Sequence, residues 1–414
     1  MSAHHLSRRA AVVVFLAFAL AYFFSALVRA ITATLSPVLT QELGLQARDL
    51  GLLAGGYFLG FSLTQLPLGR WLDRHGPRSV ILAFLSVAVL GCLAFAWADS
   101  FSGLLVARML CGVGVSACLM APLTGYRRWF NASTQLRTNS WMLMTGSLGM
   151  VAATLPVQWL LPLWGWRALF VAMGVCIAVS MLGIRLLVPH WPRHAPAHTA
   201  HTAQHDDDGG YSAVWRSHYF WRMTPIGFFS YGGMVAIQTL WAGPWMTQVA
   251  GWSAQDSATG LFVINLSMLC SFWLWGWITP ALARRGIHAD MLISCGVPLS
   301  FVAMAALVWA GPSAGGGAAF MLAAFCVSST FVSLAQPAVG MAFAPHLAGR
   351  ALSAYNLVIF AGIFVVQWGI GLGVDLARSL GLDSVAAYQA AFAVFGVASL
   401  LSWLFFMVWR TDNQ

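Results

Sequence analysis

Two arginines stand inside long apolar runs of this 414-residue chain, where charged side chains are rare. Arg29 lies in the run 11–38 and Arg108 in the run 102–125. A guanidinium cannot lose its proton in a protein, and placing it deep in a bilayer costs at least about 2.5–3.5 kcal/mol. Arg29 lies roughly 27 Å along a helix from the start of its run, and Arg108 roughly 10 Å from the outer end. Each guanidinium therefore needs a partner that compensates its charge.

The apolar runs offer these arginines no acidic partner. All twelve acids lie between the runs or at their ends, and no histidine falls in the middle of a run. The remaining partners are backbone carbonyls, neutral amides, water or an anionic solute. For Arg29 we favour an anionic solute over a structural role tied to carbonyls, and for Arg108 we favour the structural role.

Neutral polar side chains in other runs are further candidates for contact with a solute. Amides and phenols can orient a small polar solute without fixing its charge. A hydrogen bond between helices is the more common role for each one singly, but as a set we expect some to bind solute. The candidates are Tyr57, Gln238, Trp241, Asn265, Gln336, Tyr355 and Asn356.

The elements that position these residues are membrane-spanning helices. The chain is 59% hydrophobic and 8% charged, with a mean hydropathy of +0.76, whereas soluble domains carry about 25% charged residues. Repeated runs of about 20 apolar residues argue against a soluble enzyme and predict an all-α membrane protein. The basic clusters interleaved with aromatics that nucleic acid requires are absent from the sequence. The twelve runs are 11–38, 50–68, 80–97, 102–125, 139–161, 166–188, 220–247, 258–279, 291–311, 318–343, 351–374 and 388–409.

A polar linker divides the runs into two sets of six. We assign residues 1–188 to a first bundle, 189–217 to a cytoplasmic linker and 218–414 to a second bundle. Five linker histidines have the spacing of one helix face and could suggest a metal site, but nearby prolines favour a solvated tether. They are His190, His194, His198, His201 and His205.

Arginine placement predicts the orientation of the chain. Sixteen arginines fall on one side of the alternating runs and three on the other, which places both termini in the cytoplasm. Arg8 and Arg9 precede an apolar run without a small-residue cleavage site, so we expect an uncleaved first span. The seven cysteines lie within apolar runs, so a disulfide framework is not expected.

A charged turn between the second and third runs, Gly69–Arg78, must lie at a membrane face, because arginines and an aspartate do not rest in hydrocarbon. It resembles the Gly-x-x-x-Asp-Arg-x-Gly-x-Arg signature of major facilitator superfamily (MFS) transporters. The matching residues are Gly69, Asp73, Arg74, Gly76 and Arg78. A weaker copy, Gly276–Gly286, follows the eighth run, with Pro280 where the first copy has Asp73.

The resemblance implies twelve helices in two six-helix halves that are parallel repeats, with alternating access to a site between them. It implies that the charged turn acts as a gate against the cytoplasmic start of span eleven, near Arg350. There the Asp73 carboxylate would be stabilised by about 0.3–1 kcal/mol by the helix amino terminus. Arg108 begins a match to the family's Arg-x-x-x-Gly-x-Gly motif in span four, which is assigned to helix packing or coupling.

We therefore predict a secondary transporter that takes up a small organic anion, such as a carboxylate, across a bacterial inner membrane. Arg29 would be its charge partner, and a proton could travel with the solute, or anions could be exchanged. We expect a monomer, with no enzyme activity, catalytic residue, metal site, cofactor or nucleic-acid partner.

Two other cargoes remain open. A drug or metabolite efflux antiporter is disfavoured, because span five lacks the Gly-Pro motif and the early spans lack an acid. A copper(I) carrier could use methionine and cysteine sulfur, such as Met109, Cys111 and Cys118, or Met234 and Met268. Methionines scattered through an apolar protein more often fill its core.

Overall fold

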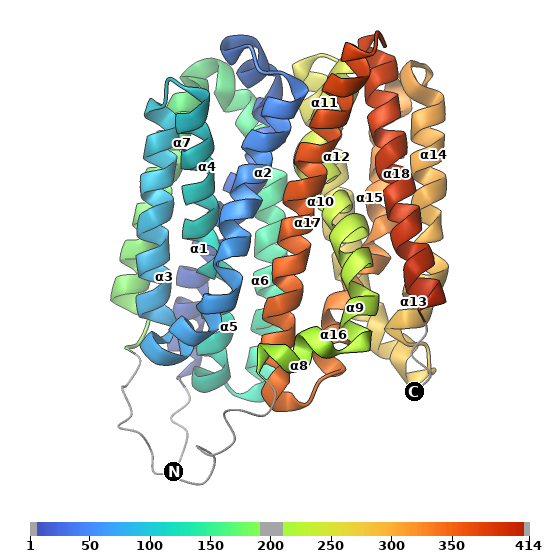
Figure 1. Cartoon of the computed structure of the whole chain (residues 1–414). Helices are drawn as coiled ribbons and strands as arrows, with labels where there is room; N and C mark the ends of the chain where they lie inside the picture. Colours follow the sequence, from blue (N-terminus) through green and yellow to red (C-terminus); the bar gives the residue numbers. More distant parts are fainter. Residues whose placement is uncertain (1–5, 191–209, 410–414) are drawn as a thin grey trace.

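The structure is a computed structural model in which residues 6–190 and 210–409 are described. Helices, turns and short connections make up these two ranges, which contain no strand. The helices run side by side in one bundle, and α1 begins and α18 ends at the same end of it (Figure 1). We call this end the terminal face and the other end the opposite face.

Helices α1 to α7 form the first half of the bundle (Figure 1). Two glycines with positive φ, Gly76 (φ 76°) in α3 and Gly165 (φ 70°) in α7, interrupt these helices and begin a new span. Pro77 suits the first position of the span after Gly76, because its nitrogen has no proton to leave unpaired. The bounds are α1 Arg8–Leu43, α2 Ala47–Leu63, α3 Gln65–Trp97, α4 Phe101–Val115, α5 Ala117–Trp129, α6 Ala132–Ala152 and α7 Leu155–Leu187.

The second half begins after a short helix, α8, and its seventh span is wound unevenly, with π-helical turns η1 and η2 between α-helical segments. π-Helical turns occur mostly at functional sites. The bounds are α8 Tyr211–Arg216, α9 His218–Pro225, η1 Ile226–Tyr231, α10 Gly232–Ala236, η2 Ile237–Trp241, α11 Ala242–Gln248, α12 Ala254–Arg284, α13 Ala289–Gly296, α14 Pro298–Ala310, η3 Gly311–Gly317, α15 Ala318–Ser329, η4 Thr330–Leu334, α16 Ala335–Met341, α17 Pro345–Ser379 and α18 Ser384–Val408.

Within the described ranges the chain makes twelve passes through the bundle. Eight helical stretches are long and apolar enough to cross a membrane, and one of them, Ala289–Met341, contains two passes. Three more passes are assembled from shorter pieces: α2 with the start of α3, α6 with the start of α7, and α9 through α11. These passes correspond to the twelve predicted runs, and most helices extend several residues beyond them.

The turns of the two halves repeat each other. Gly44 (φ 63°) ends the first span and Gly251 (φ 72°) follows the seventh. Gly76 (φ 76°) ends the second span, and Gly286 (φ 75°) ends the eighth. Corresponding turns therefore use the same residue in the same left-handed conformation, as expected of parallel repeats.

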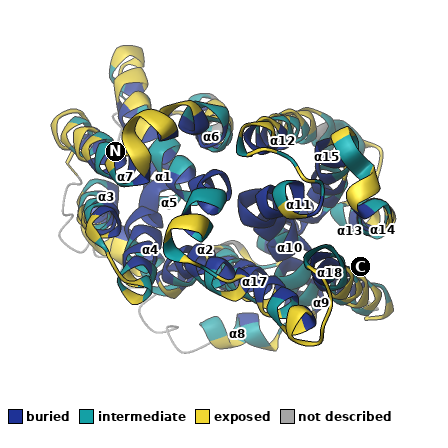
Figure 2. Cartoon of the chain, turned by 90° about the horizontal axis from the view of Figure 1, so that it is seen from above, coloured by how far each residue is buried: buried dark blue, intermediate teal, exposed yellow. Residues whose placement is uncertain are grey.

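The two halves pack tightly along α2 and α17. A Cβ atom at Gly51 of α2 would lie 2.5 Å from the carbonyl oxygen of Gln367 in α17. Gly371 of α17 similarly approaches the carbonyl of Ala47 at the start of α2. Seen along the bundle, buried residues gather between the halves and exposed residues on the rim (Figure 2). Glycine thus lets these two helices meet backbone to backbone.

The halves are joined more closely at the opposite face than at the terminal face. The Asp375 carboxylate accepts hydrogen bonds from the amides of Ala47 (3.3 Å) and Arg48 (2.9 Å), so α17 caps α2 across the interface. Gly243 of α11 lies against the Ala33 carbonyl of α1. Towards the terminal face, α5 packs mainly on α1, α3 and α6, while α16 packs mainly on α9, α13 and α17.

Candidate functional site

Arg29 lies on α1, between the two halves. Its guanidinium is 6.0 Å from the centroid of the Phe61 ring, and the side chains of Tyr22 and Tyr57 in the same half lie close enough to couple electrostatically to its charge. Tyr231 of η1, in the second half, interacts with the same guanidinium. We call these five residues the central cluster. Because it draws on both halves, its geometry must change when the halves move relative to each other.

No acidic side chain neutralises Arg29 in the part of the chain that the structure describes. No carboxylate there lies within 4.0 Å of its guanidinium. The Arg29 Nε is buried and has no hydrogen-bond partner among those residues. The guanidinium therefore keeps an uncompensated charge and an unused donor, which an anion could satisfy.

Arg108 is held within the first half. Its Nη1 donates to the Val28 carbonyl (3.0 Å) and its Nη2 to the Thr32 hydroxyl (2.6 Å). The Arg108 guanidinium also lies 5.3 Å from the Tyr57 ring centroid, and the side chain is only 1% exposed. Tyr57 thus contacts both guanidiniums, and the second positive charge raises the potential at Arg29.

The second half contributes a connected set of polar groups that we call the amide cluster: Gln238, Thr239, Trp241, Asn265 and Gln367. Gln238 Nε2 donates to Asn265 Oδ1 (3.0 Å), and Gln367 Nε2 donates to the Thr239 hydroxyl (2.9 Å). The Trp241 indole donates to the Gln367 carbonyl (3.0 Å). The side-chain oxygen of Gln367 is buried, with no partner within the described ranges. The seventh span, which carries this cluster, packs directly on α1.

The other three predicted polar candidates make hydrogen bonds between helices of the second half. Gln336 Nε2 donates to Asn356 Oδ1 (2.5 Å), joining α16 to α17. The Tyr355 hydroxyl donates to the Met223 carbonyl (3.1 Å), joining α17 to α9. The structure therefore gives these side chains packing partners, and a role in binding solute stays a prediction.

Sequence reasoning missed Gln367, Tyr22 and Tyr231. Gln367 meets the criterion that selected the other amides, because it stands in the middle of an apolar run, and it could have been included. Tyr22 and Tyr231 meet it as well, because both are phenols inside apolar runs, and Tyr22 precedes Arg29 by two turns of α1. Only the approach of Tyr231, which lies in another span, depends on tertiary packing.

The charged turn Gly69–Arg78 lies at the terminal face. Asp73 is exposed and forms no ion pair within 4.0 Å across residues 6–190 and 210–409. Gly69 has open space around it, whereas Gly76 supplies the positive φ of the turn. Arg78 Nη2 donates to the Arg185 carbonyl at the end of α7 (2.5 Å). The turn is therefore tied to α7 through Arg78, while Asp73 faces solvent.

Helix α17 begins earlier than the sequence predicted. It starts at Pro345, whose nitrogen carries no proton, and the amides of Leu347 and Ala348 already donate to the Ala344 carbonyl (2.8 and 3.0 Å). Its first turn therefore lies before the stretch near Arg350. A gate contact from Asp73 would have to reach that first turn.

The copper(I) alternative, which relies on methionine sulfur, stays open, and the described residues bear only on sites built from other ligands. They contain no group of three or more histidine, cysteine or acidic side chains that could hold a metal ion. Of the linker histidines only His190 is described, because His194, His198, His201 and His205 lie outside the described ranges.

The fold and the site define a class: a multi-pass helical membrane protein with two repeated halves and an uncompensated charge between them. A family model described as Major Facilitator Superfamily matches residues 18–367. The chain therefore belongs to the major facilitator superfamily and is a transporter, not an enzyme. The predicted all-α fold of twelve helices in two halves is confirmed.

Curated relatives match part of the chain. The 4-hydroxybenzoate transporter PcaK of Acinetobacter baylyi is 27% identical over 157 residues, 37% of this chain and 34% of the relative. The probable sulfoacetate transporter SauU of Cupriavidus necator is 25% identical over 264 residues, 58% of each chain. The probable L-galactonate transporter of Escherichia coli is 26% identical over 144 residues, 33% and 30% of the two chains. The matches cover between about a third and somewhat more than half of each relative's length.

Solved structures match nearly the whole chain. A D-xylose-proton symporter has a TM-score of 0.77 at 14% identity and covers 97% of both chains. An inward-facing, unoccupied bacterial homolog of the human lysosomal transporter Spinster has a TM-score of 0.75 at 17% identity, covering 98% of this chain and 96% of that one. At these identities the likeness concerns the fold alone.

Proposed function

We propose that this transporter takes up a small organic carboxylate and that Arg29 binds the carboxylate group. The observation that carries the proposal is a guanidinium between the two halves with no acid within 4.0 Å in the described part of the chain. A planar guanidinium can donate two parallel hydrogen bonds to a carboxylate. A buried amide or hydroxyl cannot take the place of the carboxylate in this pairing. An incoming anion would supply the negative charge that the described residues do not place beside Arg29.

The neighbours of Arg29 suit the rest of such a solute. The hydroxyls of Tyr22 and Tyr57 can donate to the same carboxylate. Phe61 and Phe360, from opposite halves, have ring centroids 4.1 Å apart and offer apolar contact. The named cargoes of the relatives, 4-hydroxybenzoate, L-galactonate and sulfoacetate, are all organic acids, which supports an anionic cargo.

We assign the polar residues of the second half to orienting the solute. Gln238, Trp241 and Asn265 belong to the amide cluster, which we extend to Gln367 because its oxygen has no partner among the described residues. Gln336, Asn356 and Tyr355 complete the set if they exchange their present bonds for solute. Neutral polar side chains of this kind would select a solute by its shape and would not require a second charge on it.

Alternating access follows from how the halves meet. The opposite face is held by Asp375 and the glycine contacts, while α5 and α16 pack mainly within their own halves near the terminal face. We propose that the bundles 1–188 and 218–414 rock about the central cluster, joined by the linker 189–217. We propose that the terminal face lies in the cytoplasm of a bacterial cell, with both termini inside, and the arginines gathered at this face support that orientation.

The charged turn serves as the inner gate in this proposal. Gly69, Asp73, Arg74, Gly76 and Arg78 would close against the first turn of α17, and Arg108 would couple spans one and four. Asp73 is unpaired within the described ranges, as expected of the open gate.

Asp73→Asn should favour the inward-open state, measured as faster thiol labelling from the cytoplasmic side. Unchanged labelling would count against the gate.

Coupling and assembly follow from the same features. No acid lies within 4.0 Å of Arg29 in the described residues, so a proton would have to travel with the solute, or one anion would be exchanged for another. We propose a monomer, because a single chain supplies both sides of the central cluster.

Transport by purified protein in proteoliposomes tests the proposal. Uptake of labelled 4-hydroxybenzoate, L-galactonate and sulfoacetate is compared between wild type, Arg29→Gln and the exposed control Arg48→Gln. We expect uptake of at least one acid by wild type and the control, and loss in Arg29→Gln. Transport of hydrophobic cations that is unaffected by Arg29→Gln would favour the efflux alternative. Binding without flux would indicate a receptor.

A further inference from the structure

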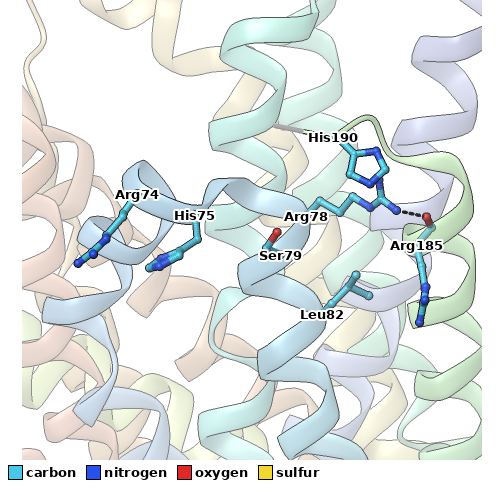
Figure 3. Close-up of a pocket in the computed structure, with 7 residues that line it drawn as sticks. All are labelled: Arg74, His75, Arg78, Ser79, Leu82, Arg185 and His190. Carbon is cyan, nitrogen blue, oxygen red and sulfur yellow. Dashed lines mark hydrogen bonds between the residues drawn. The ribbon is translucent and has the colours of Figure 1, made fainter. Parts of the chain in front are cut away.

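A cavity at the terminal face gathers positive charge away from the central cluster. It measures 560 Å³ and lies between the charged turn of α3 and the end of α7 (Figure 3). Five of its seven lining side chains are basic: Arg74, His75, Arg78, Arg185 and His190. The lining contains no carboxylate. Such a cavity attracts an anion, and it shares Arg74 and Arg78 with the charged turn but no residue with the central cluster.

The backbone at this cavity adds hydrogen-bond donors. The third span starts immediately after Gly76, and Ser79 of its first turn lines the cavity. The first amides of a helix have no partner within the helix and favour negative charge. Arg78 reaches across to the Arg185 carbonyl, with His190 beside it (Figure 3). The cavity is therefore bounded by two spans of the same half that Arg78 already joins.

Exposed apolar side chains continue from the basic cavity toward the membrane. Leu82 lines its inner end, one turn further along the third span. Leu182 and Val179, which lie about one and two turns before Arg185 on α7, are 56% and 57% exposed, and Trp71 of the charged turn is 40% exposed. A ligand with a charged head and an apolar tail would contact both kinds of surface. A free phosphate ion would use only the first.

We propose that this cavity binds the phosphate headgroup of an anionic membrane lipid, with the acyl chains along Leu82, Leu182 and Val179. Basic pockets between membrane helices on the cytoplasmic side bind anionic headgroups in this way. The lipid would bridge the second and third spans to the sixth. It would sit directly behind the gate turn and stabilise the first half as one unit.

Native mass spectrometry of the purified full chain tests this site. Phosphatidylglycerol and phosphatidylcholine of equal chain length are titrated onto wild type, Arg185→Gln with His190→Gln, and Arg284→Gln. Arg284 is a matched control, because it is an exposed arginine at the end of α12 on the same face. We expect wild type and the control to prefer phosphatidylglycerol, and the double variant to lose about fivefold of that preference. Arg185→Lys should retain it.

Three results would overturn the proposal. The first is equal retention of both lipids by wild type. The second is an unchanged preference in the double variant. The third is displacement of phosphatidylglycerol by an equimolar amount of inorganic phosphate, which would show that the acyl chains contribute nothing. Thermal unfolding of each variant confirms that it is folded, and because the readout is lipid retention, the outcome is independent of the transported solute.

Discussion

At the scale of single residues, Arg29 and Arg108 show how one side-chain type takes two roles in the same half. Arg108 has fixed acceptors in Val28 and Thr32, so its bonds hold α4 to α1. Arg29 has aromatic and phenolic neighbours and a buried Nε without a partner among the described residues. The Nε of Arg108 is also buried without a partner among the described residues, but its two terminal nitrogens have acceptors in α1.

Replacing Arg108 therefore tests a structural role. Arg108→Met fills similar space but removes the donor to the Thr32 hydroxyl and leaves the Val28 carbonyl only the amide of its own helix. Burying unpaired polar groups costs about 1–3 kcal/mol each, so we expect a lower unfolding temperature in detergent. The variant should still prefer carboxylates over neutral analogues, measured by ligand-induced thermal shift. Full stability together with a lost preference would assign Arg108 to solute binding.

The sequence alone could show that Arg29 has no acidic neighbour in its span, but not what replaces one. The neighbours come from three separate spans, so those outside α1 depend on how the second and seventh spans pack around it. Gln367 meets the criterion that selected the other amides, because it lies inside an apolar run, but it was not predicted. Its unpaired oxygen, however, depends on Thr239 and Trp241, which no spacing rule brings together with it.

At the scale of elements, glycine decides how closely the two halves approach. Glycines cluster in the second run, at Gly51, Gly55, Gly56 and Gly60, and in the eleventh, at Gly369, Gly371 and Gly373, a pattern that indicates close helix packing. It did not show that those two runs pack against each other across the halves. Gly51 and Gly371 face the partner backbone, whereas Gly369, two residues from Gly371, faces open space.

This difference gives a matched pair of substitutions. Gly51→Ala places a methyl group 2.5 Å from the Gln367 carbonyl, and overpacking of this kind costs about 1–3 kcal/mol. Gly369→Ala meets nothing within 4 Å and should stabilise its helix slightly, because alanine has the higher helix propensity. We expect unfolding temperatures below and slightly above that of wild type, respectively. Equal effects would contradict the close contact of α2 and α17.

At the scale of the whole molecule, the seal at the opposite face depends on a cap that crosses the halves. Asp375 of α17 accepts hydrogen bonds from the first amides of α2, where its charge also suits the helix amino terminus. Fold-level reasoning predicted twelve helices and two repeats from the apolar runs and the repeated turn. It could not predict this cap, because Asp375 was only one of several acids at span ends.

Removing the cap should shift the balance of the two access states. Asp375→Ala should destabilise the closed opposite face by about 1 kcal/mol, which raises the population open at that face roughly fivefold. The readout is labelling of Ser36→Cys by an impermeant maleimide in a background without native cysteines, because Ser36 is 2% exposed in this state. We expect faster labelling than with Asp99→Ala, whose carboxylate is 93% exposed. Slower or unchanged labelling would place the seal elsewhere.

The most direct test of the whole account compares a carboxylate with its uncharged amide. Binding of 4-hydroxybenzoate and 4-hydroxybenzamide, and of L-galactonate and L-galactonamide, is measured by calorimetry with wild type and Arg29→Gln. A hydrogen bond to a charged group contributes about 1.5–3 kcal/mol, so wild type should prefer the acid of at least one pair by about tenfold to a hundredfold. Arg29→Gln should bind acid and amide alike. A preference for the acid that survives in Arg29→Gln would show that another group binds the anion.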